Sequence, residues 1–372
     1  MNPLRQLRPS GQSVWLDYID RDLLTSGKLS RLIEEDDLRG VTSNPTIFDK
    51  ALSGSDSYDK QIREILAEDS DTATIELYER LAVSDIQAAA DILRPVYDES
   101  AGGDGYVSLE VSPHLANNTK NTIAEAKRLW GLVDRPNLMI KVPATPEGIP
   151  AIESLISDGY NINVTLMFSI TDYETVAQAY LRGIERLADP GKVASVASFF
   201  VSRVDGKVDQ ALEQIGTTEA LSLRGKIAVA NSKRVYRRFQ EIFDENLLIR
   251  LRQKGARSQR VLWGSTSTKN PDYPDVLYVE TLIGADTVNT MPPATIDAFR
   301  DHGTVSRTVD RDLDEADAQL ARLAELGVDL DNITEQPQAE GVKAFADSFD
   351  HLLKTIDSER RAIIEAQTAS QS

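Results

Sequence analysis

Hydrophobic positions along the chain form short runs that alternate with longer amphipathic segments. Short runs of this kind are typical of strands that are buried on both faces, as in a parallel sheet. We place these strands at 14–19, 40–42, 106–111, 138–142, 161–166, 194–200, 260–264 and 287–290. Strands that alternate with helices pair in parallel, and eight such repeats predict an α/β protein with a closed (β/α)₈ TIM barrel.

The segments between the strands have the 3.6-residue period of helices. One apolar stripe runs from Tyr173 to Leu187, and Thr171–Glu174 has the spacing of a capping box. The region 55–97 is long enough for two helices before the third strand. Beyond residue 300 the pattern is helical only, with apolar stripes at 313–323 and 342–356. We therefore expect additional C-terminal helices packed on the barrel.

The length and composition allow one large domain. A chain of 372 residues, 41% of them hydrophobic, can bury a sizeable core. Length alone favours two domains, but barrels of this type commonly run to about 250 residues as one unit. We expect a single barrel domain over 1–372, with the barrel at about 13–300 and the C-terminal helices at about 310–365.

Composition and charge exclude several function classes. The absence of cysteine excludes disulfides, thiolate zinc sites and a cysteine nucleophile. His114, His302 and His351 fit no metal-ligand spacing, so we predict no metal site. Their spacing leaves a Ser-His-Asp arrangement open, although no motif indicates one. A net charge of −18 disfavours nucleic acid and anionic membranes as partners. The N-terminus lacks the apolar core of a signal peptide, so we expect a cytoplasmic protein.

Lys141 lies inside the apolar strand 138–142. Burial disfavours a charged ammonium group. A neutral lysine amine is a nucleophile that can attack a carbonyl and form a Schiff base. The alternative is a structural lysine that reaches water or forms a salt bridge. From this segment alone the structural alternative is favoured, because perturbed lysines are often structural.

Other polar residues lie at or near the C-terminal ends of the predicted strands, where barrel enzymes carry their chemistry. They are Asp17, Asn44, Glu110, Thr165 and Ser198, followed by Arg203, Ser267 and Lys269. Singly, each has a structural explanation, such as a helix cap for Asn44 or a salt bridge for Glu110. Together they suit Schiff-base chemistry, which needs an acid/base group beside the amine and polar groups that orient a polyol. Arg203 and Lys269 indicate a phosphate anchor, helped by helix N-termini.

Several segments resemble the transaldolase family. Gly40–Phe48, with the sequence GVTSNPTIF, is similar to the family signature, and Leu138–Thr145 is similar to its Schiff-base strand. Residues 163–169 and 198–203 resemble the family's fifth and sixth strands. The similarity covers about 14–299, nearly the whole barrel. The long inserts and the C-terminal extension are similar to the longer bacterial branch.

The resemblance implies a role for each catalytic candidate. Lys141 would form the imine with the ketose donor, and Asp17 would be the base that starts carbon–carbon cleavage. Glu110 and Thr165 would position the water used in imine formation and hydrolysis. The implied substrate-binding residues are Asn44, Asn163, Ser198, Phe200, Arg203, Ser267 and Lys269.

The substrate-binding residues would divide the sugar phosphate between them. Asn44 and Ser198, with Asn163 beside them, would hold the dihydroxyacetone unit. Arg203 and Lys269 would hold the phosphate together with Ser267. Many relatives carry arginine where this chain has Lys269, and lysine keeps the charge but lacks the bidentate fork.

The implied function is that of a transaldolase of the pentose phosphate pathway. Such an enzyme transfers a dihydroxyacetone unit from sedoheptulose 7-phosphate or fructose 6-phosphate to an aldose phosphate, such as erythrose 4-phosphate or glyceraldehyde 3-phosphate. We expect no metal or organic cofactor, sugar phosphates as substrates, and a monomer or homodimer.

Two alternatives are weaker. Fructose-6-phosphate aldolases are similar but shorter, and they tend to carry glutamine and tyrosine in place of Glu110 and Phe200. They release free dihydroxyacetone. A catalytically silent sugar-phosphate-binding barrel would be expected to have lost Lys141, Asp17 or Glu110, and all three are present.

Overall fold

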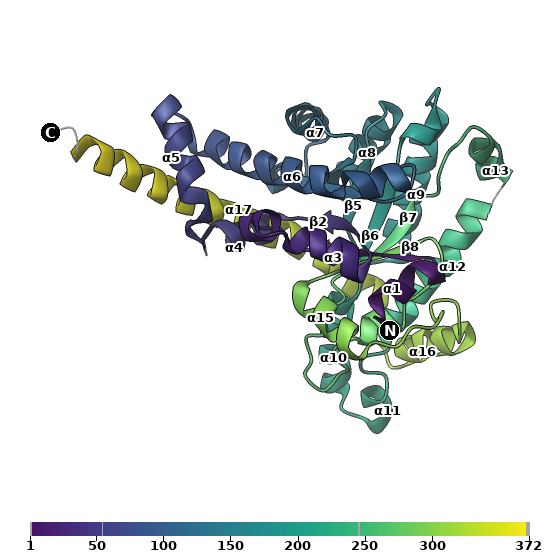
Figure 1. Ribbon diagram of the computed structural model, residues 1–372. Coiled ribbons are helices and arrows are strands. Elements are labelled where there is room, and N and C mark those ends of the chain that lie inside the picture. Colours follow the sequence, from purple (N-terminus) through teal and green to yellow (C-terminus); the bar gives the residue numbers. More distant parts are fainter. Residues whose placement is uncertain (1, 54, 245, 370–372) are drawn as a thin grey trace.

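Eight parallel strands form the closed barrel of this protein, and helices surround it (Figure 1). The computed structural model describes residues 2–53, 55–244 and 246–369. Each strand pairs with the next in the chain, and β8 pairs with β1. The strands are β1 (Gln12–Asp17), β2 (Leu38–Thr42), β3 (Tyr106–Glu110), β4 (Leu138–Pro143), β5 (Ile162–Met167), β6 (Ser195–Phe200), β7 (Arg260–Gly264) and β8 (Thr287–Met291). The predicted (β/α)₈ barrel is confirmed, and each predicted strand end lies within two residues of the observed one.

The helices lie outside the barrel and at its two ends (Figure 1). Their bounds are α1 (Leu4–Leu7), α2 (Arg21–Thr25), α3 (Lys28–Asp36), α4 (Pro45–Ser53), α5 (Asp59–Glu68), α6 (Thr74–Glu99), α7 (Thr119–Val133), α8 (Gly148–Ser157), α9 (Ile170–Glu185), α10 (Ser202–Ile215), α11 (Thr218–Leu221), α12 (Ile227–Asp244), α13 (Asn246–Gln253), α14 (Leu277–Glu280), α15 (Pro293–His302), α16 (Leu313–Glu325) and α17 (Leu330–Ala369). The two helices predicted in 55–97 are α5 and α6. Within the described ranges, no helix is both long and apolar enough to cross a membrane.

The capping box of α9 differs from the prediction. The helix begins at Ile170, and its N-cap is Ser169, which has an extended backbone. The Ser169 hydroxyl accepts from the Asp172 backbone N–H at 3.0 Å, and the Asp172 carboxylate accepts from the Ser169 N–H at 3.1 Å. The predicted box at Thr171–Glu174 is wrong because Thr171 already lies inside the helix, whereas an N-cap must lie just before it.

Side chains along each strand alternate between the inside and the outside of the barrel. Outside, a large apolar core joins the strands to the helices. Inside, the N-terminal half of the barrel is filled by a smaller apolar cluster that includes Trp15, Met139, Val196 and Leu262. The Trp15 ring occupies the place that a side chain on Gly40 would take, since a Cβ there would come within 2.5 Å of the ring. Two residues further along β1 and β4, the same inward face carries Asp17 and Lys141, so the polar layer begins where the apolar one ends.

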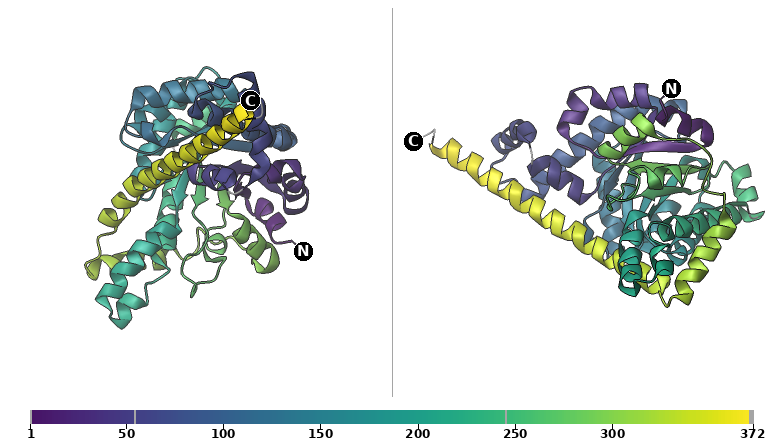
Figure 2. Two further views of the ribbon diagram at one scale, coloured as in Figure 1. Left: turned by 90° about the vertical axis from the view of Figure 1, so that its left-hand side faces the viewer. Right: turned by 90° about the horizontal axis from the view of Figure 1, so that it is seen from below.

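The long C-terminal helix α17 crosses the C-terminal end of the barrel and then continues past α4 and α5 (Figures 1 and 2). The Gln338 amide donates to the carbonyls of Ala144 and Leu166 at 3.0 and 3.1 Å, near the ends of β4 and β5. Ser348 and Thr46 join the helix to α4 through a hydroxyl pair at 2.9 Å. The predicted C-terminal helices are therefore present, and one of them lies over the end of the barrel that carries the candidate site.

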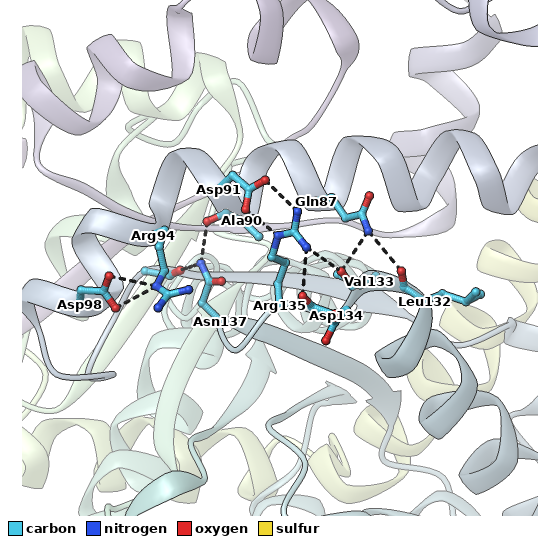
Figure 3. A network of polar contacts seen from close by, with 11 residues as sticks. Gln87, Ala90, Asp91, Arg94, Asp98, Leu132, Val133, Asp134, Arg135 and Asn137 are labelled. Carbon is cyan, nitrogen blue, oxygen red and sulfur yellow. Dashed lines mark hydrogen bonds and ion pairs between the residues drawn. The ribbon is translucent and has the colours of Figure 1, made fainter. Parts of the chain in front are cut away.

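Polar contacts fasten α6 to the connection between α7 and β4 (Figure 3). Arg135 pairs with Asp91 at 2.6 Å, and the Gln87 amide donates to two carbonyls at the end of α7. Asn137 is fully buried and donates to the carbonyls of Ala90 and Gly105 at 2.9 and 2.8 Å. Because Asn137 immediately precedes β4, these contacts set the position of the strand that carries Lys141.

We expect Asn137→Ala to lower the free energy of unfolding by about 1–3 kcal/mol, because it leaves two buried carbonyls without their donor. Urea unfolding measures the change. Arg94→Ala is a suitable control on α6, since it removes an exposed ion pair to Asp98, and such pairs contribute about 0–1 kcal/mol. An effect of Asn137→Ala no larger than that of the control would contradict the prediction.

Candidate active site

The floor of the candidate site is a buried ion pair between two neighbouring strands. Lys141 on β4 lies directly beside Glu110 on β3, and its Nζ is 3.3 Å from Glu110 Oε2. Lys141 Nζ also donates to the Ser43 carbonyl at 3.1 Å, and the residue is only 4% exposed. Burial raises the pKa of Glu110, and the charge of Asp17 raises it further, while Lys141 lowers it. A carboxylate in this position can accept a proton from the Lys141 ammonium.

Asp17 is the second carboxylate of the site, at the end of β1. The Thr42 hydroxyl donates to Asp17 Oδ1 at 2.7 Å and is itself paired with Thr290 at 2.7 Å. Burial raises the pKa of Asp17, whereas Lys141, the Thr42 hydrogen bond, Arg203 and Lys269 lower it. Asp17 thus faces three cations, and a carboxylate with a raised pKa is a stronger base than an exposed aspartate.

A cavity of about 570 Å³ opens above these groups, and we call it the front cavity. Eight of the eleven predicted site residues line it: Lys141, Asp17, Asn44, Ser198, Phe200, Arg203, Ser267 and Lys269. They come from β1, β4, β6, α10 and the segments after β2 and β7, so the barrel brings together residues that are far apart in the sequence. Convergence at the C-terminal end of the strands is the arrangement that the sequence predicted.

The other three predicted residues lie behind this wall. Glu110 contacts Lys141, as described above. Asn163 is fully buried on β5, where it accepts from Ser198 Oγ at 2.6 Å and donates to Ser108 Oγ at 3.0 Å. It therefore orients Ser198 from beneath. Thr165 is also fully buried, and its hydroxyl has no hydrogen-bond partner within the described part of the chain.

Besides Lys141, three further cations line the front cavity. Arg203, in the first turn of α10, lies over the Phe200 ring at 5.2 Å from its centroid, and Phe200 packs edge-on against Phe168. Lys269 donates to Ser267 Oγ at 2.8 Å. Lys50 of α4 lines the same cavity. Four cations around one cavity, Lys141 included, in a chain of net charge −18, are suited to an anionic substrate.

Sequence reasoning missed several residues that shape this site. Thr42 and Ser43 lie within the GVTSNPTIF motif and could have been found there, since Thr42 ends β2 and Ser43 follows it. Phe345 is different, because the sequence indicates only that it belongs to the apolar stripe of a C-terminal helix. In the structure its ring centroid is 5.7 Å from Lys141 Nζ, and it lines the front cavity. No local pattern encodes a contact between β4 and α17.

Comparison with known proteins agrees with this geometry. Residues 14–356 match the family described as Transaldolase/Fructose-6-phosphate aldolase. The chain is 49% identical to a transaldolase of Thiobacillus denitrificans over 96% of this chain and 100% of the relative. It is 48% identical to transaldolases of Parafrankia sp. and Thermobifida fusca, in both cases over 95% of this chain and 97% of the relative. The chain therefore belongs to the transaldolase/fructose-6-phosphate aldolase family.

Proposed function

We propose that this protein is a transaldolase that transfers a dihydroxyacetone unit from sedoheptulose 7-phosphate or fructose 6-phosphate to an aldose phosphate. The observation that carries the proposal is the buried Lys141–Glu110 pair at the floor of a cavity that also holds Asp17 and Arg203. Full-length relatives named transaldolase, at 48–49% identity, support the same activity.

The first stage is formation of the imine. Glu110 takes a proton from Lys141, and the neutral amine attacks C2 of the ketose. A carbon–nitrogen bond forms, and the former carbonyl oxygen leaves as water with protons supplied by the amine and the acid/base group. Glu110 and Thr165 would position this water. The protonated imine then withdraws electrons from the sugar, so the proposed reaction uses no metal or organic cofactor.

The second stage is cleavage and transfer. Asp17 takes the proton of the C4 hydroxyl, the C3–C4 bond breaks, and its electron pair moves into the imine to give an enamine on Lys141. The first aldehyde departs, and the enamine carbon attacks the acceptor aldehyde, whose oxygen regains the proton from Asp17. Hydrolysis of the new imine releases the product and restores Lys141.

The remaining side chains would bind the substrate. Asn44 and Ser198 would hold the dihydroxyacetone hydroxyls, with Asn163 holding Ser198 in position. Arg203 would bind the phosphate, together with Lys269 and Ser267 across the front cavity. A single-domain organisation, a cytoplasmic location and a monomeric or homodimeric state stay predictions from the sequence.

Product analysis with and without an acceptor tests the proposed function. With fructose 6-phosphate and erythrose 4-phosphate, we expect sedoheptulose 7-phosphate and glyceraldehyde 3-phosphate. With fructose 6-phosphate alone, we expect little free dihydroxyacetone. Steady release of dihydroxyacetone without an acceptor would identify a fructose-6-phosphate aldolase instead. Binding of sugar phosphates without turnover would identify a silent barrel.

Phe200→Tyr should shift the protein from transfer toward release of free dihydroxyacetone. The enamine must survive until the acceptor arrives, and Phe200 offers no hydroxyl that could protonate it. A phenol at this position in the front cavity adds an acid/base group. We expect more dihydroxyacetone from fructose 6-phosphate alone and slower transfer. If the folded variant keeps the parent's ratio of the two activities, Phe200 serves only in packing.

A further inference from the structure

A second cavity, of about 260 Å³, lies behind the Lys141–Glu110 pair, and we call it the back cavity. It is enclosed by the ends of β2 and β3 together with α4, α6, α7 and α17. Glu110 lines the back cavity, whereas its partner Lys141 lines the front cavity. Among the described residues, Asn44 lines both. The ion pair therefore spans a thin wall between two separate spaces.

The helix α17 closes both spaces with neighbouring aromatic rings. Phe345 lines the front cavity and Phe349, one turn further along, lines the back cavity. On the strand side, the Ser43 carbonyl that accepts from Lys141 belongs to a residue lining the back cavity. A small molecule in the back cavity can thus reach Glu110 without entering the sugar-binding space.

Several polar side chains besides Glu110 line the back cavity. Arg128 of α7, 43% exposed, donates to Glu79 and Glu125, in each case at 2.8 Å, and all three line the cavity. Tyr78 also lines it, and burial raises the pKa of its phenol, with Glu79, Glu110 and Glu125 raising it further. Water in a cavity needs about two to four polar partners, and these side chains supply them.

The proposed reaction requires water at the buried pair twice in each cycle. One water leaves when the Lys141 amine condenses with the donor ketone, and one water is consumed when the product imine is hydrolysed. At both moments the sugar is bonded to Lys141 Nζ and occupies the floor of the front cavity. Water that travelled through the front cavity would have to pass the bound sugar phosphate.

We propose that the back cavity carries water and protons between solvent and Glu110 while the sugar occupies the front cavity. This inference rests on the proposed transaldolase function. It gives the two cavities different roles: the front cavity determines sugar affinity, and the back cavity determines how fast the imine forms and is hydrolysed. Glu110 connects the two cavities, because it lines the back cavity and pairs with Lys141, which lines the front cavity.

Chemical rescue with formate tests the route. Glu110→Ala removes the acid/base group and leaves space beside Lys141, so we expect transfer activity to fall strongly and formate to restore part of it. Because formate would enter through the back cavity, saturating fructose 6-phosphate should not compete with the rescue. Competition by the sugar would show that formate enters from the front and would overturn the proposal. So would the absence of any rescue.

A matched pair of substitutions on α6 locates the route. Ala82 lines the back cavity and is 2% exposed, whereas the partly buried Ala88 of the same helix packs elsewhere. In the Glu110→Ala background, Ala82→Leu should abolish formate rescue, and Ala88→Leu should leave it intact. Val83→Phe, at a partly exposed position of the same cavity, replaces Ala82→Leu if that variant does not fold. Rescue that survives filling of the cavity contradicts the proposal.

With Glu110 in place, Ala82→Leu should slow imine formation and hydrolysis without changing the Michaelis constant for fructose 6-phosphate. Time-resolved borohydride trapping on Lys141 measures both steps.

The parent protein distinguishes failure of the proposed function from failure of the route: if the parent neither transfers nor traps a sugar on Lys141, the proposed function itself fails. If the parent transfers normally while Ala82→Leu leaves trapping unchanged, only the route through the back cavity fails.

Discussion

Lys141→Arg should abolish transfer activity and leave no sugar bonded to the protein after borohydride reduction. The reason is that a guanidinium keeps its proton in proteins and cannot act as the amine nucleophile. In the parent, we expect reduction in the presence of fructose 6-phosphate to attach a three-carbon unit to Lys141. Peptide mass mapping locates that adduct.

Lys50→Arg is the matched control for this experiment. Lys50 also lines the front cavity, but it lies on α4 and is exposed. Its substitution should leave the adduct on Lys141 and most of the activity in place. Of these two lysines, Lys141 is the one that donates to the Ser43 carbonyl and pairs with Glu110 in the described part of the chain. An adduct on another lysine, or full activity with no adduct, would refute the Schiff-base assignment.

Arg203→Ala should raise the Michaelis constant for phosphorylated sugars by roughly tenfold to a hundredfold, since a charge-assisted contact contributes about 1.5–3 kcal/mol. The variant should use non-phosphorylated donors or acceptors, such as dihydroxyacetone, almost as well as the parent does. The structural basis is the position of Arg203 at the start of α10, beside the front cavity and over the Phe200 ring. Steady-state kinetics with matched phosphorylated and plain sugars measure the difference.

Two further variants sharpen the interpretation. Lys207 lies on the same helix but does not line the front cavity, and it forms an ion pair with Glu340 at 2.7 Å. Lys207→Ala should therefore change the Michaelis constants for phosphorylated and for plain sugars only slightly. Arg203→Lys keeps the charge but loses the bidentate geometry, so it should fall between the parent and Arg203→Ala. An equal loss for phosphorylated and plain sugars would make Arg203 a structural residue.

Much of the fold could be predicted because the relevant signals are local. Buried parallel strands are short apolar runs, and amphipathic helices repeat every 3.6 residues, so each can be recognised within a dozen residues. The position of Lys141 in such a run, and of Asp17 at the end of another, indicated polar groups where an apolar layer was expected. The GVTSNPTIF motif added a family resemblance that comparison with known proteins supports. The N-cap of α9 was misplaced because both Ser169–Asp172 and Thr171–Glu174 have the spacing of a capping box.

The sequence by itself determined the eight strands, the alternation with helices and the set of polar side chains at the strand ends. Only the tertiary structure decided which of these side chains meet. The register between β3 and β4 pairs Glu110 with Lys141, and burial beneath Ser198 turns Asn163 into a supporting residue. The path of α17 places Phe345 near Lys141 and makes one helix line both the front cavity and the back cavity. Periodicity encodes which face of an element is buried, whereas contacts between distant elements depend on register and packing, which no short stretch of sequence contains.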